Sequence, residues 1–209
     1  MIHESPGPSV TCLCPTYRRP ECLRDAVRCF LRQDYANRHL LILNDAPEPV
    51  DAAALGLPRE MGRVVNAPER YPTLGHKRQA LLEMAETPLV AHWDDDDLVL
   101  PWHLSMSVSA WQAPPQATCV RSNLAWFGLG PRGAWRLRGP CRNVWEGLMV
   151  FERERALSLG GYALLDSGQA KVLLEAFART GELHTWDPRL CDISYIYRWA
   201  DGHRHVSAR

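Results

Sequence analysis

The sequence predicts an α/β protein in which helices flank a mostly parallel sheet. Between residues 10 and 93, short apolar runs alternate with amphipathic segments in the order strand, helix, strand, strand, helix, strand. The run at 39–43 is almost wholly apolar, as expected of a parallel strand covered on both faces. Right-handed crossovers in this order bring the ends of strands one, two and four to one edge, where open α/β sheets bind ligands.

Prolines and apolar spacing mark the first elements. Val10–Cys14 is a β-prone run closed by Pro15, and we expect a strand there. Pro20 opens a helix whose apolar residues recur at i, i+3, i+4, i+7 and i+8. The strand predicted at 39–43 follows, and Asp45 lies just beyond its end.

Four further elements complete the first half. The sequence predicts a weak helix at 52–57 and a short strand at 63–66. A stronger helix at 74–85 carries its apolar residues on one side, and the strand at 89–93 follows it.

The second half has a different pattern. We expect one domain over residues 1–209, with a change of pattern near residue 100. After residue 100 the sequence predicts helices at 101–111, 152–159 and 168–180, and strands at 117–127, 134–137, 148–151 and 193–199.

The composition excludes several classes of protein. Of the 209 residues 46% are hydrophobic and 23% are charged, which is ordinary for a globular protein. The formal net charge of +0 gives no general attraction to nucleic acid, so we expect no nucleic-acid partner. No run approaches the roughly 18 apolar residues of a transmembrane segment, and the N-terminus does not resemble a signal peptide. The seven cysteines form no C-x-x-C pair, so we expect buried thiols in a cytoplasmic protein.

Four consecutive aspartates, Asp94–Asp97, follow the strand at 89–93 directly. At ~4 Å and an effective dielectric near 20, each contact between like charges costs about 4 kcal/mol, so a missing cation is expected. Alternate residues of an extended segment share a face, so Asp94 and Asp96 can point at one ion. Carboxylate oxygens suit Mg²⁺ or Mn²⁺. The alternative is a solvated acidic surface, with Asp97 capping a helix that starts near Pro101.

Four motifs in this order resemble a known family. The segments are CPTYRRP, LLILNDAP, TLGHKRQALLEMA and VAHWDDDDLVLP, within residues 9–105. They resemble the nucleotide-sugar half of the family-2 glycosyltransferases, which have the GT-A fold, a Rossmann-like α/β architecture. Later segments, VFERERALSLGGY and YIYRWADGHRHVS, resemble that family more loosely. The resemblance implies a nucleotide-sugar-binding half at 9–105 and a small mixed acceptor-side half at 106–209.

The resemblance implies a nucleoside site at the first two strand ends. Pro15, Thr16 and Tyr17 would line the base pocket, with the Tyr17 ring offering an apolar face to the base. Asp45 would accept hydrogen bonds from the base edge, typically a uracil imide. Each could instead be structural, with Tyr17 packing on the next helix and Asp45 capping a turn.

The resemblance also implies a diphosphate site. Gly75 belongs to the Gly-x-x-Arg motif that begins the second helix. Lys77 and Arg78 lie near that helix start, where charge and dipole favour a diphosphate. They could equally be a solvated helix face.

The same resemblance implies a metal site of Mn²⁺ or Mg²⁺. Asp94 and Asp96 would hold the ion, and Asp94 or Asp95 would hold the ribose. A histidine near the C-terminus, His203 or His205, would complete the metal shell, and the His-Val-Ser context favours His205.

The expected reaction is transfer of a sugar from a nucleoside-diphosphate sugar to a hydroxyl acceptor, with inversion. The cation would make the diphosphate a better leaving group, and a carboxylate would remove the acceptor proton. The family's Glu-Asp pair is replaced here by Gly168–Lys171, which contains no carboxylate. Asp166 is the nearest replacement, and Glu175 is a weaker one. A group of the substrate could serve instead.

The missing pair leaves a second hypothesis, a nucleotide-sugar-binding protein with weak or no transfer activity. A Mg²⁺-dependent nucleotidyltransferase is disfavoured because the loop after the first strand contains no glycine. The acceptor, whether a glycan, a lipid-linked sugar or a small molecule, is left open. A partner or a second subunit of a homodimer could complete its site.

Overall fold

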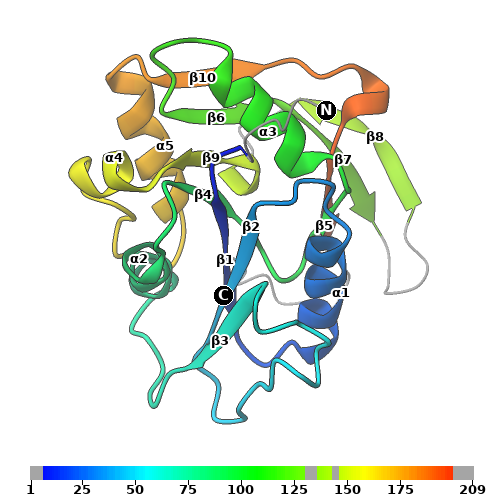
Figure 1. The fold of residues 1–209 in the computed structure, drawn as a ribbon, viewed down its shortest axis with the longest axis vertical. Helices are drawn as coiled ribbons and strands as arrows, with labels where there is room; N and C mark the ends of the chain where they lie inside the picture. The colour runs from blue at the N-terminus through cyan, green and yellow to red at the C-terminus, as the bar shows by residue number, and fades with distance from the viewer. Residues whose placement is uncertain (1–6, 130–135, 143–145, 200–209) are drawn as a thin grey trace, which may run out of the picture.

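The computed structural model describes residues 7–129, 136–142 and 146–199. Within these ranges, seven strands form the central sheet in the order β10-β6-β9-β4-β1-β2-β3 (Figure 1). Their bounds are β1 Val10–Thr16, β2 Arg38–Asn44, β3 Gly62–Asn66, β4 Leu89–His92, β6 Cys119–Ser122, β9 Val150–Glu152 and β10 Leu183–Trp186.

The predicted parallel half of the sheet is confirmed. Strand β1 pairs in parallel with β2 and β4, and β2 pairs in parallel with β3. The carboxyl ends of β1, β2 and β4 therefore lie at one edge, as the strand order predicted. The mixed character of the second half is confirmed as well, because β9 runs antiparallel to both β4 and β6.

A smaller sheet extends this core. It has the order β5-β11-β7-β8, with bounds β5 Leu98–Val99, β7 Leu124–Leu129, β8 Arg136–Arg142 and β11 Tyr195–Trp199. Strand β5 directly follows the four aspartates, and its antiparallel partner β11 comes almost a hundred residues later. The small sheet therefore brings the end of the described chain against the aspartates.

Helices cover both faces of the central sheet. Their bounds are α1 Pro20–Leu31, α2 Leu74–Met84, α3 His103–Gln112, α4 Arg153–Ser158 and α5 Gln169–Arg179, with 3₁₀ turns η1 at Glu146–Leu148 and η2 at Leu190–Asp192. Figure 1 shows α1 and α3 on one side of β1 and β4, and α2, α4 and α5 on the other.

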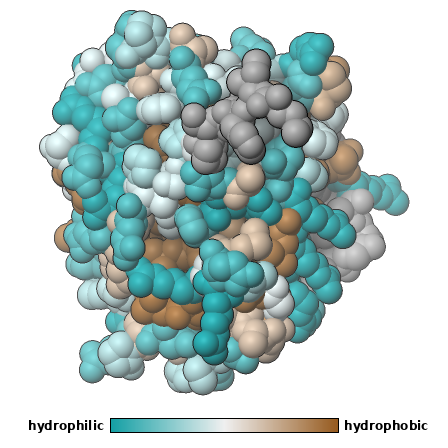
Figure 2. All heavy atoms as spheres, viewed as in Figure 1, coloured by the Kyte–Doolittle hydropathy of each residue, from teal (hydrophilic) through white to brown (hydrophobic). Residues whose placement is uncertain are grey.

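Two apolar clusters correspond to these layers. Cys12 and Cys14 of β1 pack with α1 and α3, whereas Leu13 points into the cluster with α2, α4 and α5. Alternation along one strand thus fills both cores. Figure 2 shows mostly hydrophilic residues on the viewed face, with apolar residues gathered in a smaller area of its lower half. No helix in the described ranges is long and apolar enough to cross a bilayer.

Several element predictions were wrong in detail. Strand β1 continues through Pro15 to Thr16, because a proline near a strand end loses little pairing. The segment predicted as a helix at 52–57 forms turns. The strand predicted at 117–127 is divided into β6 and β7, and the sequence missed β10.

The cysteine prediction is correct for most positions. Cys12, Cys14, Cys22 and Cys119 are buried thiols, and none of the seven forms a disulfide among the residues that the structure covers. Cys191 is exposed, so the expectation of burial does not extend to it.

Candidate active site

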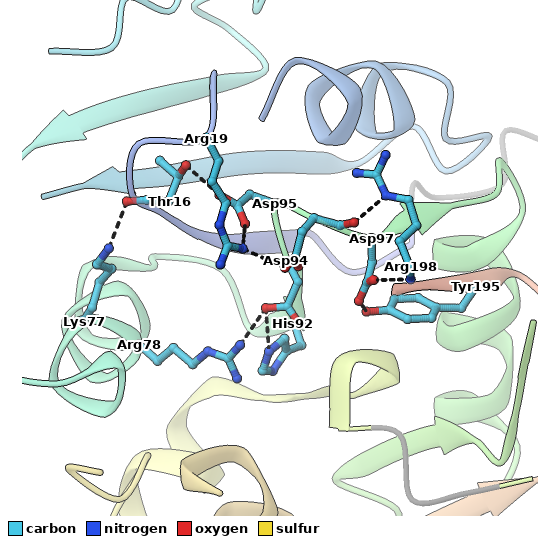
Figure 3. Close-up of polar contacts among 11 residues, drawn as sticks. Thr16, Arg19, Lys77, Arg78, His92, Asp94, Asp95, Asp97, Tyr195 and Arg198 are labelled. Atoms are coloured by element: carbon cyan, nitrogen blue, oxygen red, sulfur yellow. Dashed lines mark hydrogen bonds and ion pairs between the residues drawn. The ribbon is translucent and has the colours of Figure 1, made fainter. Parts of the chain in front are cut away.

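The four aspartates lie at the sheet edge formed by the ends of β1, β2 and β4. They line a cavity of about 280 Å³. The other walls come from the end of β1, the start of α2, the turn η1, the first turn of α5 and strand β11. Segments far apart in the sequence therefore converge on one acidic loop (Figure 3).

Arg19 is the counter-ion of the two central aspartates. Its guanidinium contacts Asp96 Oδ2 at 2.6 Å and Asp95 Oδ1 at 3.2 Å. Thr16 donates its hydroxyl to the other oxygen of Asp95 at 2.7 Å. Burial, followed by the neighbouring Asp96 charge, raises the pKa of Asp95 to about 7.

The first aspartate has a different set of partners. Arg78 contacts Asp94 Oδ1 at 2.6 Å, and His92 Nε2 lies 3.3 Å from the same oxygen. His92 is fully buried beneath the loop, and burial lowers its pKa, so it faces Asp94 as a neutral ring. Figure 3 shows Arg78 and His92 converging on Asp94.

The fourth aspartate is structural. Asp97 accepts hydrogen bonds from the Tyr195 hydroxyl and, at 2.8 Å, from the backbone N–H of Arg198. The Arg198 side chain bonds the Asp96 carbonyl and reaches Asp25 of α1 at 3.0 Å. Burial raises the pKa of Asp97 well above its ordinary value. Because α3 begins at His103, Asp97 does not cap that helix.

These contacts explain how four consecutive carboxylates can lie together. The repulsion among the acids is offset within the protein by Arg19 and Arg78, so it does not by itself require a metal. Among the described residues, no three histidine, cysteine or acidic side chains group closely enough to hold an ion. His203 and His205, the predicted tail ligands, lie outside the described residues.

The donor set still fits a hard divalent ion. Asp94 and Asp96 both line the cavity, and their side chains keep 22% and 17% of their surface exposed. Mg²⁺ and Mn²⁺ commonly take one or two carboxylates and fill the remaining positions with water and substrate phosphate. The metal assignment therefore stays a prediction for Asp94 and Asp96.

A smaller cavity of about 60 Å³ lies beside the first and is lined by Tyr17, Asp45, Arg70 and Lys77, among others. The Arg70 guanidinium lies 4.5 Å from the centre of the Tyr17 ring, so this aromatic face already binds a cation. Asp45 is buried and accepts the Tyr71 backbone N–H at 3.1 Å. The structure thus brings the predicted nucleoside-site residues Tyr17 and Asp45 together.

Lys77 connects helix α2 to the strand ends beside the smaller cavity. It is buried, pairs with Asp45, and donates to the carbonyl of Thr16 at 2.9 Å. Burial lowers its pKa, and the Asp45 carboxylate partly offsets that effect. Lys77 therefore joins α2 to the ends of β1 and β2 rather than forming a solvated helix face.

Gly75 has a packing role that its motif did not reveal. A Cβ atom there would lie 2.0 Å from the Ala163 carbonyl oxygen and 2.6 Å from the Leu165 nitrogen. Its own N–H donates to the Leu165 carbonyl at 2.9 Å. The glycine thus lets α2 approach the loop that leads to Asp166.

The predicted base, Asp166, lines both cavities. Gln169, at the start of α5, lines the larger one, as does Glu146 of η1. Sequence reasoning missed Glu146, because a single acid between two short elements carries no pattern that identifies its location.

The fold and the site together define an α/β protein of the GT-A type, with an acidic loop at the carboxyl edge of its sheet. The chain belongs to glycosyl transferase family 2, since the model of that family matches residues 11–176.

Solved structures support the fold. S. aureus TarS 1-349 in complex with UDP-GlcNAc matches with a TM-score of 0.73 and 13% identity, over 96% of this chain and 61% of that one. TarS 1-349 in complex with UDP matches with a TM-score of 0.69 and 12% identity, over 91% and 60%. The mannosyltransferase PcManGT from Pyrobaculum calidifontis, in complex with GDP-Man and Mn²⁺, matches with a TM-score of 0.63 and 19% identity, over 91% and 57%.

The chain thus spans about 60% of the length of these structures. A search of curated proteins gives no match.

Proposed function

We propose that this chain transfers a sugar from a nucleoside-diphosphate sugar to a hydroxyl acceptor with inversion, and that the nucleotide is UDP. The observation that carries the proposal is the meeting of Tyr17, Asp45 and the Asp94–Asp97 loop at one sheet edge, with two adjoining cavities. TarS in complex with UDP and UDP-GlcNAc, and PcManGT in complex with GDP-Man and Mn²⁺, are supporting precedents on the same fold.

The nucleoside occupies the smaller cavity in this proposal. The Tyr17 ring offers a face for the base once Arg70 moves aside, and the Asp45 carboxylate accepts from the base edge. The diphosphate then lies toward the acidic loop, where the guanidinium groups of Arg19 and Arg78 are available to it.

Asp94 and Asp96 would hold a Mn²⁺ or Mg²⁺ ion, which when bound supplies charge stabilisation to the departing diphosphate. The protein contributes the rigid frame of that loop. Tyr195 and the Arg198 N–H donate to Asp97, and Thr16 donates to Asp95. Asp95 and Asp97, on either side of Asp96, therefore hold the loop in place.

Asp166 is the candidate base that the sequence offers for the acceptor hydroxyl. It lies on the wall shared by the two cavities. The segment that the resemblance aligns with the family's acidic pair, Gly168–Lys171, contains no carboxylate. The Gln169 amide cannot take up a proton at neutral pH, so in this proposal a carboxylate elsewhere in the cavity takes the role.

Calorimetric titration of UDP and GDP, with and without Mn²⁺, tests the proposal. We expect metal-dependent binding of UDP, and at least a tenfold loss of that binding in Asp96→Asn. Asp34→Asn, an exposed aspartate elsewhere, is the matched control. UDP affinity that is the same with and without Mn²⁺ and unchanged in Asp96→Asn would refute the site assignment.

The second candidate is a protein that binds the donor without efficient transfer, which the carboxylate-free start of α5 favours. The two functions differ in turnover. Binding of UDP without release of UDP from UDP-sugars, in the presence of a panel of hydroxyl acceptors, would favour the binding protein.

A further inference from the structure

The larger cavity contains two hydrogen-bond acceptors for which the described part of the chain supplies no donor. Gln169 is 4% exposed, and its Oε1 has no hydrogen-bond partner among the described residues. The Glu146 carboxylate, half-buried in η1, makes no hydrogen bond or ion pair with any residue in the described ranges. Both side chains line the cavity that holds the acidic loop.

An unpartnered buried oxygen is costly, and it identifies the chemistry of its missing partner. Leaving such a group unsatisfied costs free energy, so natural proteins rarely do so without a reason. Both groups are acceptors, so a ligand with O–H donors complements them, whereas a phosphate, which is itself an acceptor, does not. The hydroxyls of a sugar or polyol fit that requirement.

Their location separates Glu146 from Asp166. Asp166 also lines the smaller cavity with Tyr17 and Asp45, which places it on the nucleoside side, and it already has an interaction partner. Of these two cavities Glu146 lines the larger, and its charge acts on His92 and Tyr197 beside the acidic loop. Inversion needs the proton acceptor on the side of the sugar away from the leaving diphosphate.

We propose that Glu146 and Gln169 form the subsite for the acceptor hydroxyl, and that Glu146 takes up its proton. This inference rests on the transferase function proposed above. The hydroxyl oxygen forms a bond to the anomeric carbon as the bond from that carbon to the phosphate oxygen breaks. The electron pair of the broken bond leaves on the nucleoside diphosphate, and the hydroxyl proton moves to the Glu146 carboxylate. Gln169 orients the acceptor by accepting a hydrogen bond from a second hydroxyl.

Donor hydrolysis tests the role of Glu146, with water taking the place of the acceptor. UDP-GlcNAc and GDP-Man are incubated with Mn²⁺, and release of free sugar is followed. We expect Glu146→Gln to slow hydrolysis about 100-fold, in line with loss of a general base, with UDP affinity unchanged within twofold. Glu146→Asp should keep part of the activity, and Glu154→Gln, an exposed glutamate of α4, should keep all of it.

Gln169→Met gives a second readout that needs no turnover. Because it removes an unpartnered oxygen at nearly constant volume, it should raise the Tm of the ligand-free chain by about 2 °C. A side chain kept for structure alone would lower the Tm on replacement. The variant should bind UDP as the wild type does and should hydrolyse the donor more slowly.

The outcomes separate the two proposals. If the wild-type chain binds neither UDP nor GDP, the proposed function fails. If nucleotide binding is intact but Asp166→Asn abolishes hydrolysis while Glu146→Gln leaves it at the wild-type rate, the subsite is refuted alone. A Tm of Gln169→Met that is equal to or below that of the wild type would also overturn it.

Discussion

His103 should make the protein sensitive to acid. Its ring is 1% exposed, packs against Trp93 and Tyr195, and bonds the Ser194 hydroxyl at 2.9 Å. Burial alone lowers its pKa to about 4. In the unfolded chain a histidine protonates near pH 6.5, so the stability from the neutral buried ring is present above that pH and is lost as the pH falls toward 4. At pH 4.5, two units below the unfolded pKa, the loss is roughly 3 kcal/mol at about 1.4 kcal/mol per unit.

Urea unfolding at pH 7.5 and pH 4.5, in EDTA and without nucleotide, measures this effect in wild type and His103→Gln. The substitution costs packing at both pH values, so the relevant quantity is the change of its ΔΔG with pH. Between pH 7.5 and pH 4.5, we expect the free energy of unfolding of His103→Gln to fall by roughly 3 kcal/mol less than that of the wild type. His39→Gln, the same substitution at an exposed position, is the control. Equal losses in wild type and His103→Gln would show that this ring is not a source of acid sensitivity.

Two further predictions concern packing and a surface ion pair. Gly75→Ala should destabilise the chain by about 2 kcal/mol and weaken UDP binding, because the new methyl group would collide with the Ala163 carbonyl oxygen. Chemical denaturation measures the loss of stability. Gly139→Ala is the control because, in the described part of the chain, no atom of a non-adjacent residue lies within 4 Å of a Cβ there. Glu182 accepts hydrogen bonds from Arg155 Nε and Nη2 at 2.6–2.7 Å and from the Thr118 hydroxyl at 2.6 Å, which lowers its pKa to about 2. Its stabilisation is present above the unfolded pKa and is lost in acid, so Glu182→Gln should cost about 1 kcal/mol at pH 7 and little at pH 2.5 in thermal melts.

The sequence predicted the parallel half of the fold because each strand there carries a strong local signal. Strand β2 is apolar almost throughout, and α1 keeps one apolar face. Strand β10 was missed since Leu183–Trp186 mixes polar and apolar residues and, within the described residues, pairs with β6 alone. Strand β5 has two residues and exists only because β11 pairs with it. Such elements depend on tertiary contacts that no local pattern contains.

In the candidate site too, local patterns predict where residues lie, whereas tertiary contacts decide their partners. Strand order was enough to predict that Thr16, Asp45 and the aspartates would meet. It could not predict their partners, because Arg19 reaches Asp95 across 76 residues and Arg198 reaches the acidic loop across 102. The run of four acids indicates electrostatic repulsion, but it does not reveal that Arg19 and Arg78 offset it. The cation at Asp94 and Asp96 stays a prediction.

This internal compensation has a consequence for substrate binding. Arg19 and Arg78 occupy the carboxylates that a metal would use, so Mn²⁺ alone must compete with two short ion pairs. On the proposed function, a diphosphate that drew these guanidinium groups to itself would free Asp94 and Asp96 to hold the ion, and a bound ion would leave the arginines to the diphosphate. We therefore expect Mn²⁺ alone to bind weakly, and UDP and Mn²⁺ to raise each other's affinity by the same factor, as linkage requires. Isothermal titration of each ligand with and without the other measures both factors. Tight Mn²⁺ binding to the free protein, unaffected by UDP, would show that Arg19 and Arg78 do not compete with the ion for Asp94 and Asp96.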